Sequence, residues 1–186
     1  MIFSGSRRSH STPLVPADTP TAERVLRSAE YLGLDPSQTM LVGSAALCIY
    51  GVELDTNDPL IQQSWPRPSD LDFASTPLYM NHLAAHGTPT GLEAHLKPTH
   101  NPSQTILTIS TKELPADIIT RFRPGRDNLL SYHKRFLAYL EQHSRPVEGT
   151  AIRIITQPAA LKELQSHSLD PKVARDLSLA RQHFTH

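Results

Sequence analysis

Two aspartates separated by one residue, Asp70 and Asp72, are the side chains of this 186-residue chain best suited to chemistry. In a strand, the period of two places both carboxylates on one face. Two neighbouring carboxylates repel each other, and the pKa of one rises unless a cation lies between them. Hard oxygen ligands at this spacing suit Mg²⁺, with Mn²⁺ as a substitute. The pair therefore predicts a divalent-cation site.

A Gly-Ser pair upstream of these aspartates predicts a phosphate site. The apolar run 40–42 stops at Gly43, and Ser44 opens an alanine-rich apolar segment that reaches Tyr50. This order is typical of a strand, a tight turn and a helix. The backbone N–H groups at the start of such a helix, together with the Ser44 hydroxyl, can bind a phosphate without a basic side chain. Gly43 lets the backbone approach closely.

A third acid and an arginine extend the candidate site. Asp117 lies in an apolar run that predicts a buried strand, and a buried acid needs a partner. Beside Asp70 and Asp72 it would complete a set of three carboxylates. Arg67 shortly precedes the pair and could brace Asp70 or contact a phosphate, because a guanidinium pairs well with both. An exposed loop arginine without a role is the alternative interpretation.

These residues resemble the nucleotidyltransferase superfamily, in the branch of minimal nucleotidyltransferases and the AbiEii-like toxins of bacterial toxin–antitoxin systems. The resemblance rests on residues 42–47, residues 67–73 and Asp117. It continues into the C-terminal third, where it implies that Lys162, Lys172 and Asp176 face the nucleotide. The implied fold is a nucleotidyltransferase fold of the α/β (α+β) class, with a small mixed sheet flanked by helices and a helical C-terminal region.

The resemblance also implies an activity and partners. The expected enzyme transfers a nucleoside monophosphate from an NTP to an acceptor hydroxyl and releases pyrophosphate. Gly43 and Ser44 would hold the β and γ phosphates. Asp70, Asp72 and Asp117 would hold Mg²⁺, and Asp117 would also take the proton of the acceptor. RNA, above all the 3′ end of tRNA, is the expected acceptor, and a cognate antitoxin is the expected protein partner.

Two alternatives stay open. One is nucleotidyl transfer to a protein or to an antibiotic. The other is a non-catalytic nucleotide-binding or partner-binding module of the same fold. Two features favour the module: a polar insertion at residues 53–66 that separates the Gly-Ser turn from the aspartates, and Val173, which stands where the family often has an aspartate.

Composition limits the remaining classes. The chain has 18 lysine and arginine residues and 18 aspartate and glutamate residues, so its formal net charge is zero. An overall positive charge that would indicate a nucleic-acid partner is therefore lacking. No segment approaches the ~20 apolar residues of a membrane span, and the first residues lack the apolar core of a signal peptide. The single cysteine, Cys48, fits a reducing compartment and is expected in the core. A soluble cytoplasmic protein without a membrane partner is expected.

Hydrophobic periodicity places these motifs on elements. Residues 1–20 predict a flexible arm, and residues 21–186 predict a single domain with a core at about 37–122 and a helical part at about 127–186. Strands are expected at residues 40–42, 70–74, 92–96, 106–109, 116–120 and 152–155. Helices are expected between Thr21 and Gly33, at 44–50, 78–86 and 128–143, and from Pro158 and Pro171. The aromatic residues of helix 128–143 are expected in the core.

Overall fold

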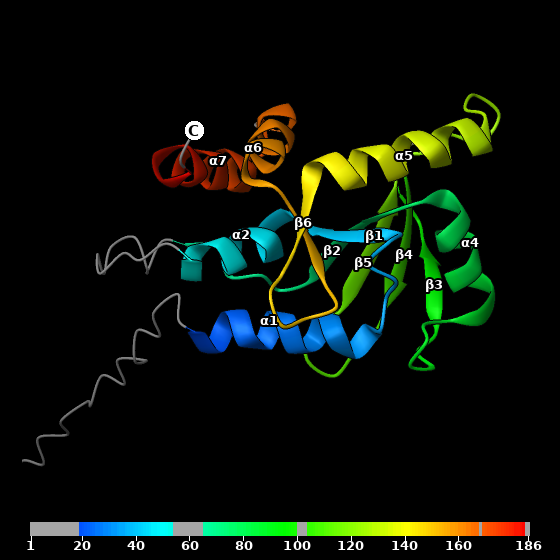
Figure 1. Ribbon diagram of the computed structural model, residues 1–186, viewed down its shortest axis with the longest axis horizontal. Helices are drawn as coiled ribbons and strands as arrows, with labels where there is room; N and C mark the ends of the chain where they lie inside the picture. Colours follow the sequence, from blue (N-terminus) through cyan, green and yellow to red (C-terminus); the bar gives the residue numbers. More distant parts are fainter. Residues whose placement is uncertain (1–18, 54–64, 100–103, 168, 185–186) are drawn as a thin grey trace, which may run out of the picture.

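The computed structural model describes residues 19–53, 65–99, 104–167 and 169–184, which form a mixed α/β domain (Figure 1). Its helices are α1 (Thr19–Leu32), α2 (Gly43–Glu53), α4 (Pro77–His86), α5 (Leu129–His143), α6 (Gln157–Ser166) and α7 (Pro171–His183). Its strands are β1 (Thr39–Val42), β2 (Leu71–Ser75), β3 (Ala94–Lys97), β4 (Thr105–Ile109), β5 (Ala116–Thr120), β6 (Ser144–Pro146) and β7 (Arg153–Ile155). The α/β class expected from the sequence, with a mixed sheet flanked by helices, is therefore confirmed.

The seven strands form one sheet in the order β3-β4-β5-β2-β1-β7-β6. Strand β2 pairs antiparallel with β1 and parallel with β5, and β1 pairs parallel with β7. The remaining neighbours, β3 with β4, β4 with β5 and β6 with β7, are antiparallel. The sheet is therefore mixed, and its central strands β1, β2 and β5 carry the predicted motifs or lie directly beside them.

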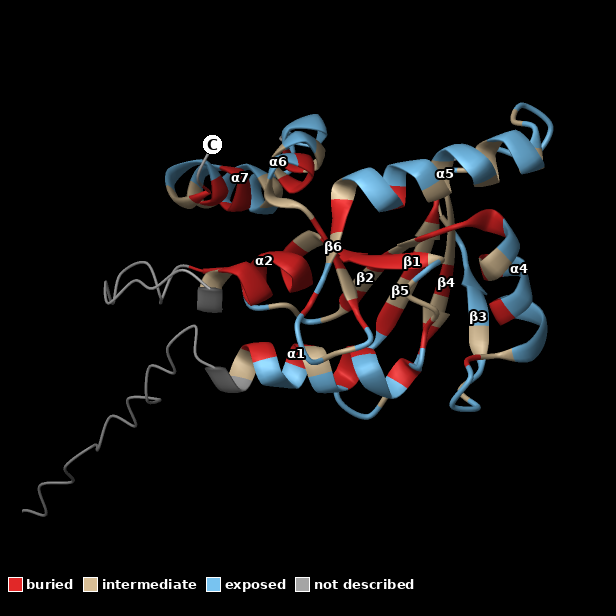
Figure 2. Cartoon of the chain, viewed as in Figure 1, coloured by how far each residue is buried: buried red, intermediate tan, exposed pale blue. Residues whose placement is uncertain are grey.

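Residues along β2 and β5 alternate between buried and half-buried, as expected for a sheet with one face against a core. Leu71 and Phe73 of β2 are buried with Ile118 of β5, and they share one apolar cluster with Val25 of α1 and Leu83 of α4. The opposite face of these strands is only half-buried (Figure 2). This second face carries the aspartates.

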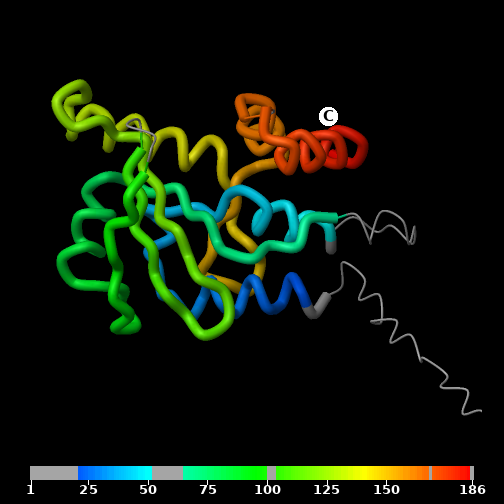
Figure 3. Tube along the Cα trace, turned by 180° about the vertical axis from the view of Figure 1, so that it is seen from behind, coloured from blue at the N-terminus to red at the C-terminus, as the bar shows by residue number. Residues whose placement is uncertain are grey.

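Helices lie on both sides of the sheet. Figures 1 and 3 show α5, α6 and α7 along one side and α1 along the other. Several helices begin at side-chain caps that satisfy the first backbone N–H groups. The Thr76 hydroxyl caps α4, the Asn128 side chain caps α5 and the Asp170 carboxylate caps α7. The Asp170 cap therefore fixes where the last helix, α7, begins.

Trp65 anchors the chain just before the aspartates. Its ring packs so closely against α2 that a Cβ added at Gly51 would clash with the indole, and the indole nitrogen donates a hydrogen bond to the carbonyl oxygen of Leu47. The ring also meets that of His183 edge-on, with ring centroids 5.9 Å apart. These contacts hold the residues that follow Trp65 between α2 and α7.

The main differences between the structure and the sequence expectations concern α1, β6 and the aromatic residues of α5. Helix α1 begins at Thr19, two residues before the expected start at Thr21. Strand β6 was not expected, because three residues that end in Pro146 carry no alternating pattern. The aromatic residues of α5 are not core residues: Phe136 is half-buried and Tyr139 is exposed.

Other expectations have simpler outcomes. Cys48 is buried in α2, as expected. None of the helices in the described ranges has the length and apolar character needed to cross a membrane. The arm predicted at residues 1–20 and the insertion at 53–66 fall mostly outside the described residues.

Candidate active site

Strand pairing brings the Gly-Ser turn and two of the aspartates together. In the register of β1 with β2, Val42 lies opposite Asp72. In the register of β2 with β5, Asp72 lies opposite Asp117. Directly opposed side chains on neighbouring strands point to the same face and lie about 5 Å apart at Cβ. The length of the insertion therefore does not set the separation of the turn from Asp72.

Gly43 occupies a position that favours glycine for two reasons. Its φ is +64°, in the left-handed region that side-chain-bearing residues rarely adopt. A Cβ built on it would lie 3.0 Å from Oδ2 of Asp72. Ser44, the next residue of α2, is buried. The start of an 11-residue helix, with its positive end and outward N–H groups, thus lies against the Asp72 carboxylate.

Asp72 is the most electrostatically perturbed carboxylate of the site. Burial, followed by the charges of Asp70 and Asp117, raises its pKa from 3.8 to about 6. Lys172 of α7 acts in the opposite direction, and Glu163 of α6 adds to the rise. Strong perturbation by burial and neighbouring charges is typical of functional sites. These charges also place the first turns of α7 and the middle of α6 near the aspartate-bearing face.

Asp70 lies just before β2, is half-buried and accepts a hydrogen bond from the Ser69 hydroxyl at 3.2 Å. Asp117 has stronger partners. The Lys97 ammonium donates to its Oδ2 at 2.6 Å, and the Thr108 hydroxyl donates to its Oδ1 at 2.7 Å. The hydrogen bond and the charge of Asp117 raise the pKa of Lys97, so the ammonium form persists. Both Asp117 oxygens are thus engaged by protein donors.

The donor chemistry of the three aspartates suits a hard divalent cation, as oxygen ligands should. Within the described parts of the chain, however, no group of three His, Cys, Asp or Glu side chains is gathered closely enough to hold a metal ion. Asp117 faces Lys97 and Thr108 rather than a common centre with the other two. The residues therefore fit a cation held by Asp70 and Asp72, with Asp117 available only after a change of partner.

A cationic cavity is lined by Lys172, whose charge acts on Asp72. It has a volume of about 270 Å³ and is lined by Trp65, Pro66, Arg67, Lys172, Arg175 and Asp176. Three of its residues are cations and one is an acid. Asp176 is buried, and burial raises its pKa against the opposing charges of Lys172 and Arg175. The excess of positive charge suits an anionic ligand.

The cavity unites three of the residues expected at a nucleotide, since Arg67, Lys172 and Asp176 all line it. Lys162 is different: it is an exposed residue of α6 and is not among those lining the cavity. Its neighbour Glu163 acts on Asp72 and forms an ion pair with Arg121 at 3.0 Å. The structure therefore brings together most, but not all, of the predicted substrate-binding residues.

Sequence reasoning missed Lys97, Thr108 and Arg175. Lys97 ends an edge strand and Arg175 lies in a polar helix, positions where an exposed cation carries no signal. Thr108 alternates with buried Leu107 and Ile109, so the period of two could have placed it on the open face. Its contact with Asp117 depends on the register of β4 with β5, which the sequence does not specify.

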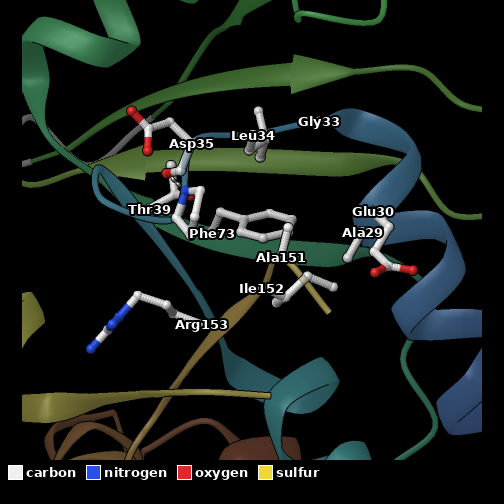
Figure 4. Close-up of a pocket in the computed structure, with 11 residues that line it drawn as sticks. Ala29, Glu30, Gly33, Leu34, Asp35, Thr39, Phe73, Ala151, Ile152 and Arg153 are labelled. Atoms are coloured by element: carbon white, nitrogen blue, oxygen red, sulfur yellow. Dashed lines mark hydrogen bonds between the residues drawn. The ribbon is translucent and has the colours of Figure 1, made fainter. Parts of the chain in front are cut away.

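A second, more apolar cavity of about 230 Å³ lies between α1, β1, β2 and the connection from β6 to β7. Figure 4 shows the Phe73 side chain beside Leu34, Ala151 and Ile152. Phe73 and Asp72 are adjacent in β2 and therefore point to opposite faces. This cavity shares no lining residue with the cationic one, and the candidate chemistry lies on the other face of the sheet.

Comparison with known proteins gives limited information. No protein-family model matches this chain, and no curated protein sequence matches it. Among solved structures, the Megavirus polyadenylate synthase aligns with 94% of this chain, with a TM-score of 0.47 and 9% sequence identity. This chain covers 36% of that protein. A similarity of this size concerns the general arrangement of elements only, so membership of the nucleotidyltransferase superfamily and of its AbiEii-like branch stays a prediction.

Proposed function

We propose that this protein is a divalent-cation-dependent nucleotidyltransferase that moves a nucleoside monophosphate from an NTP to an acceptor hydroxyl. One observation carries the proposal: strand register lays the Gly43 helix start, Asp72 and Asp117 side by side, and Lys172, whose charge acts on Asp72, lines a cavity with three cations. A helix start and a cationic cavity provide for the phosphates, and the carboxylates provide for the cation and the proton. This combination suits phosphoryl chemistry on a triphosphate.

In this proposal the acceptor oxygen attacks the α-phosphorus, the bond to the β-phosphate breaks, and pyrophosphate leaves. Asp70 and Asp72 would hold Mg²⁺ or Mn²⁺, which would supply charge neutralisation for the triphosphate and the leaving group. Asp117 would accept the proton of the attacking hydroxyl. Holding the reactants in line and neutralising charge account for most of the rate in such transfers.

In this arrangement, two parts of the protein would bind the phosphates: the start of α2 and the cations of α7. The N–H groups that begin α2, with Gly43 and Ser44, would hold the phosphates nearest the carboxylates. Lys172 and Arg175 would contact the remaining phosphate charge, since both line the cavity and both belong to α7. Arg67 would close the cavity from the other side. Lys162 has no part in this binding mode.

RNA, above all the 3′ end of tRNA, is the acceptor we propose, and a toxin role with a cognate antitoxin is the finer form of the proposal. Both come from the sequence resemblance alone. A protein or antibiotic acceptor is the competing form. The cationic cavity is compatible with every one of these acceptors, because it concerns the nucleotide that they share.

A second candidate is a nucleotide-binding module without turnover. The ion pair of Lys97 with Asp117 favours it, because a carboxylate whose two oxygens accept from Lys97 and Thr108 is less available to a cation or an acceptor hydroxyl. The module would bind an NTP in the cavity without releasing pyrophosphate.

The decisive experiment incubates the protein with Mg²⁺, total tRNA and each α-labelled NTP in turn, with pyrophosphate release measured in parallel. The control is the double variant Asp70→Asn, Asp72→Asn, whose fold is checked by thermal unfolding. Label on RNA that the control loses would support the proposal. Label on the protein would support the protein-modifying form. NTP binding with no pyrophosphate for any acceptor would overturn transfer and leave the binding module.

The role of the cavity has its own test. We expect Lys172→Met and Arg175→Met each to weaken NTP binding about 5- to 50-fold, because each removes a charge-assisted contact. The matched control is Arg181→Met, an exposed arginine in the last turn of the same helix that does not line the cavity. Equal effects at Arg175 and Arg181 would show that the overall charge of α7, and not the cavity, attracts the nucleotide.

A further inference from the structure

Lys97 reaches Asp117 across two strands. It is the last residue of β3 and pairs with Ile106 of β4, which in turn pairs with Ile119 of β5. Directly opposed residues share a face of the sheet, so Lys97 lies on the same face as Asp117. It is level with Ile119, two residues beyond Asp117 in β5. Its long side chain crosses this diagonal and places Nζ 2.6 Å from Oδ2 of Asp117.

We propose that Lys97 is a positioning residue that competes with a divalent cation for Asp117. Its ammonium holds the Asp117 carboxylate away from Asp70 and Asp72 and must leave before Asp117 can join them around a cation. The inference rests on the carboxylate site of the proposed function, and it adds a residue that controls how this site is completed.

The two partners of Asp117 differ in how readily they can leave. The Thr108 hydroxyl lies directly opposite Asp117 in the register of β4 with β5, so the sheet itself fixes it. The Lys97 side chain is 50% exposed and ends an edge strand, whereas the Asp117 side chain is only 13% exposed. A lysine stem with four methylenes can turn toward water without disturbing the backbone. Lys97 is therefore the partner that a cation would displace.

The positive charge of Lys97 opposes the binding of a divalent cation at the carboxylates. An ammonium and a divalent cation repel each other, and both are attracted by the same three carboxylates. The lysine charge thus opposes cation binding even where its atoms do not occupy the site. It also offsets part of the repulsion that Asp117 exerts on the neighbouring carboxylates.

The test measures Mn²⁺ affinity by the electron paramagnetic resonance signal of unbound Mn²⁺ at pH 7.5, without nucleotide. We expect Lys97→Met to tighten Mn²⁺ binding about tenfold, the size of effect that one nearby unit charge produces in a largely aqueous environment. Lys97→Gln should act in the same direction, which guards against a folding defect of one variant. Thermal unfolding checks each protein.

Two controls separate position from charge. Lys97→Arg keeps the positive charge and should leave the affinity close to that of the unchanged protein. Lys112→Met removes the same charge from an exposed residue between β4 and β5 and should not tighten binding. Unchanged or weaker Mn²⁺ binding in both folded Lys97 variants would overturn the inference, and so would equal tightening by Lys112→Met.

Pyrophosphate release from NTP in the presence of Mg²⁺ and total tRNA is measured on the same proteins and reports the proposed function separately. Tighter Mn²⁺ binding without pyrophosphate from any variant would support the role of Lys97 and refute nucleotidyl transfer. Pyrophosphate release together with unchanged Mn²⁺ affinity would support transfer and refute the role of Lys97. Absence of Mn²⁺ binding in every variant would also overturn the inference, because no competition would then exist.

Discussion

Replacing Asp72 with asparagine is expected to stabilise the protein above pH 6 while removing the carboxylate that the proposed activity needs. Burial and the charges of Asp70 and Asp117 raise the pKa of Asp72 from 3.8 to about 6. The folded protein therefore holds this proton more tightly than the unfolded chain does. Ionising Asp72 above that pH costs folding free energy, and asparagine removes the cost.

The sign and size follow from linkage. Near pH 4 the carboxyl is largely protonated in the folded protein, and the penalty is small. As the pH rises from about 4 to about 6, the unfolded chain ionises first and wild-type stability falls through this group. Above pH 6 the full penalty applies. The pKa difference between 3.8 and about 6 corresponds to at most about 3 kcal/mol of folding free energy. We therefore expect Asp72→Asn to raise the free energy of unfolding by about 1 to 3 kcal/mol above pH 6.

Urea unfolding of both proteins at a series of pH values from 4 to 8, with EDTA and without nucleotide, measures this difference. The matched control is Glu148→Gln, which removes a carboxylate charge from an exposed turn residue and should show no such gain. A stability difference between Asp72→Asn and wild type that stays constant from pH 4 to pH 8 would refute the reasoning, as would a less stable variant at pH 7.5.

Two further variants test the local structure. Gly43→Ala should lower the free energy of unfolding by about 2 kcal/mol, because it adds backbone strain at φ +64° and a Cβ 3.0 Å from Asp72. The control Gly149→Ala adds similar strain at φ +75° but has no atom within 4 Å of its Cβ. It should therefore cost about half as much in urea unfolding. Tyr50→Phe should cost about 1 to 2 kcal/mol, because it deletes a buried hydroxyl that donates to a β7 carbonyl at 2.8 Å, whereas Tyr31→Phe at an exposed position should be neutral in the same assay. Equal costs within either pair would contradict the assignment.

Most elements were predictable because their patterns are local. Residues 116–120 form a short run of β-branched and small apolar residues around Asp117, and β5 spans those residues. The α4 helix follows a Thr-Pro start and stops at Gly87, which are signals that act within one turn. Strand β6 was missed because its three residues become a strand only by pairing with β7, an interaction that lies outside any local window.

The candidate site divides in the same way. Gly43, Asp70 and Asp72 were found because they lie in two short stretches whose residue types already suggest their chemistry. The partner that occupies Asp117 could not be found, since Lys97 is 20 residues away and reaches Asp117 only through the registers of two strand pairs. The expectation of a core role for the α5 aromatics failed because a helical period shows which residues share a face and not what covers that face.

The pairing of Val42 with Asp72 has an evolutionary consequence. Because hydrogen bonds between β1 and β2 set the distance from the Gly-Ser turn to the Asp72 carboxylate, the connection between α2 and β2 can lengthen, shorten or change composition without moving either group. Natural selection can therefore change that connection independently of the turn and the carboxylate. Relatives of this chain should differ most in the spacing between their two motifs and least in the residues that the sheet holds opposite each other.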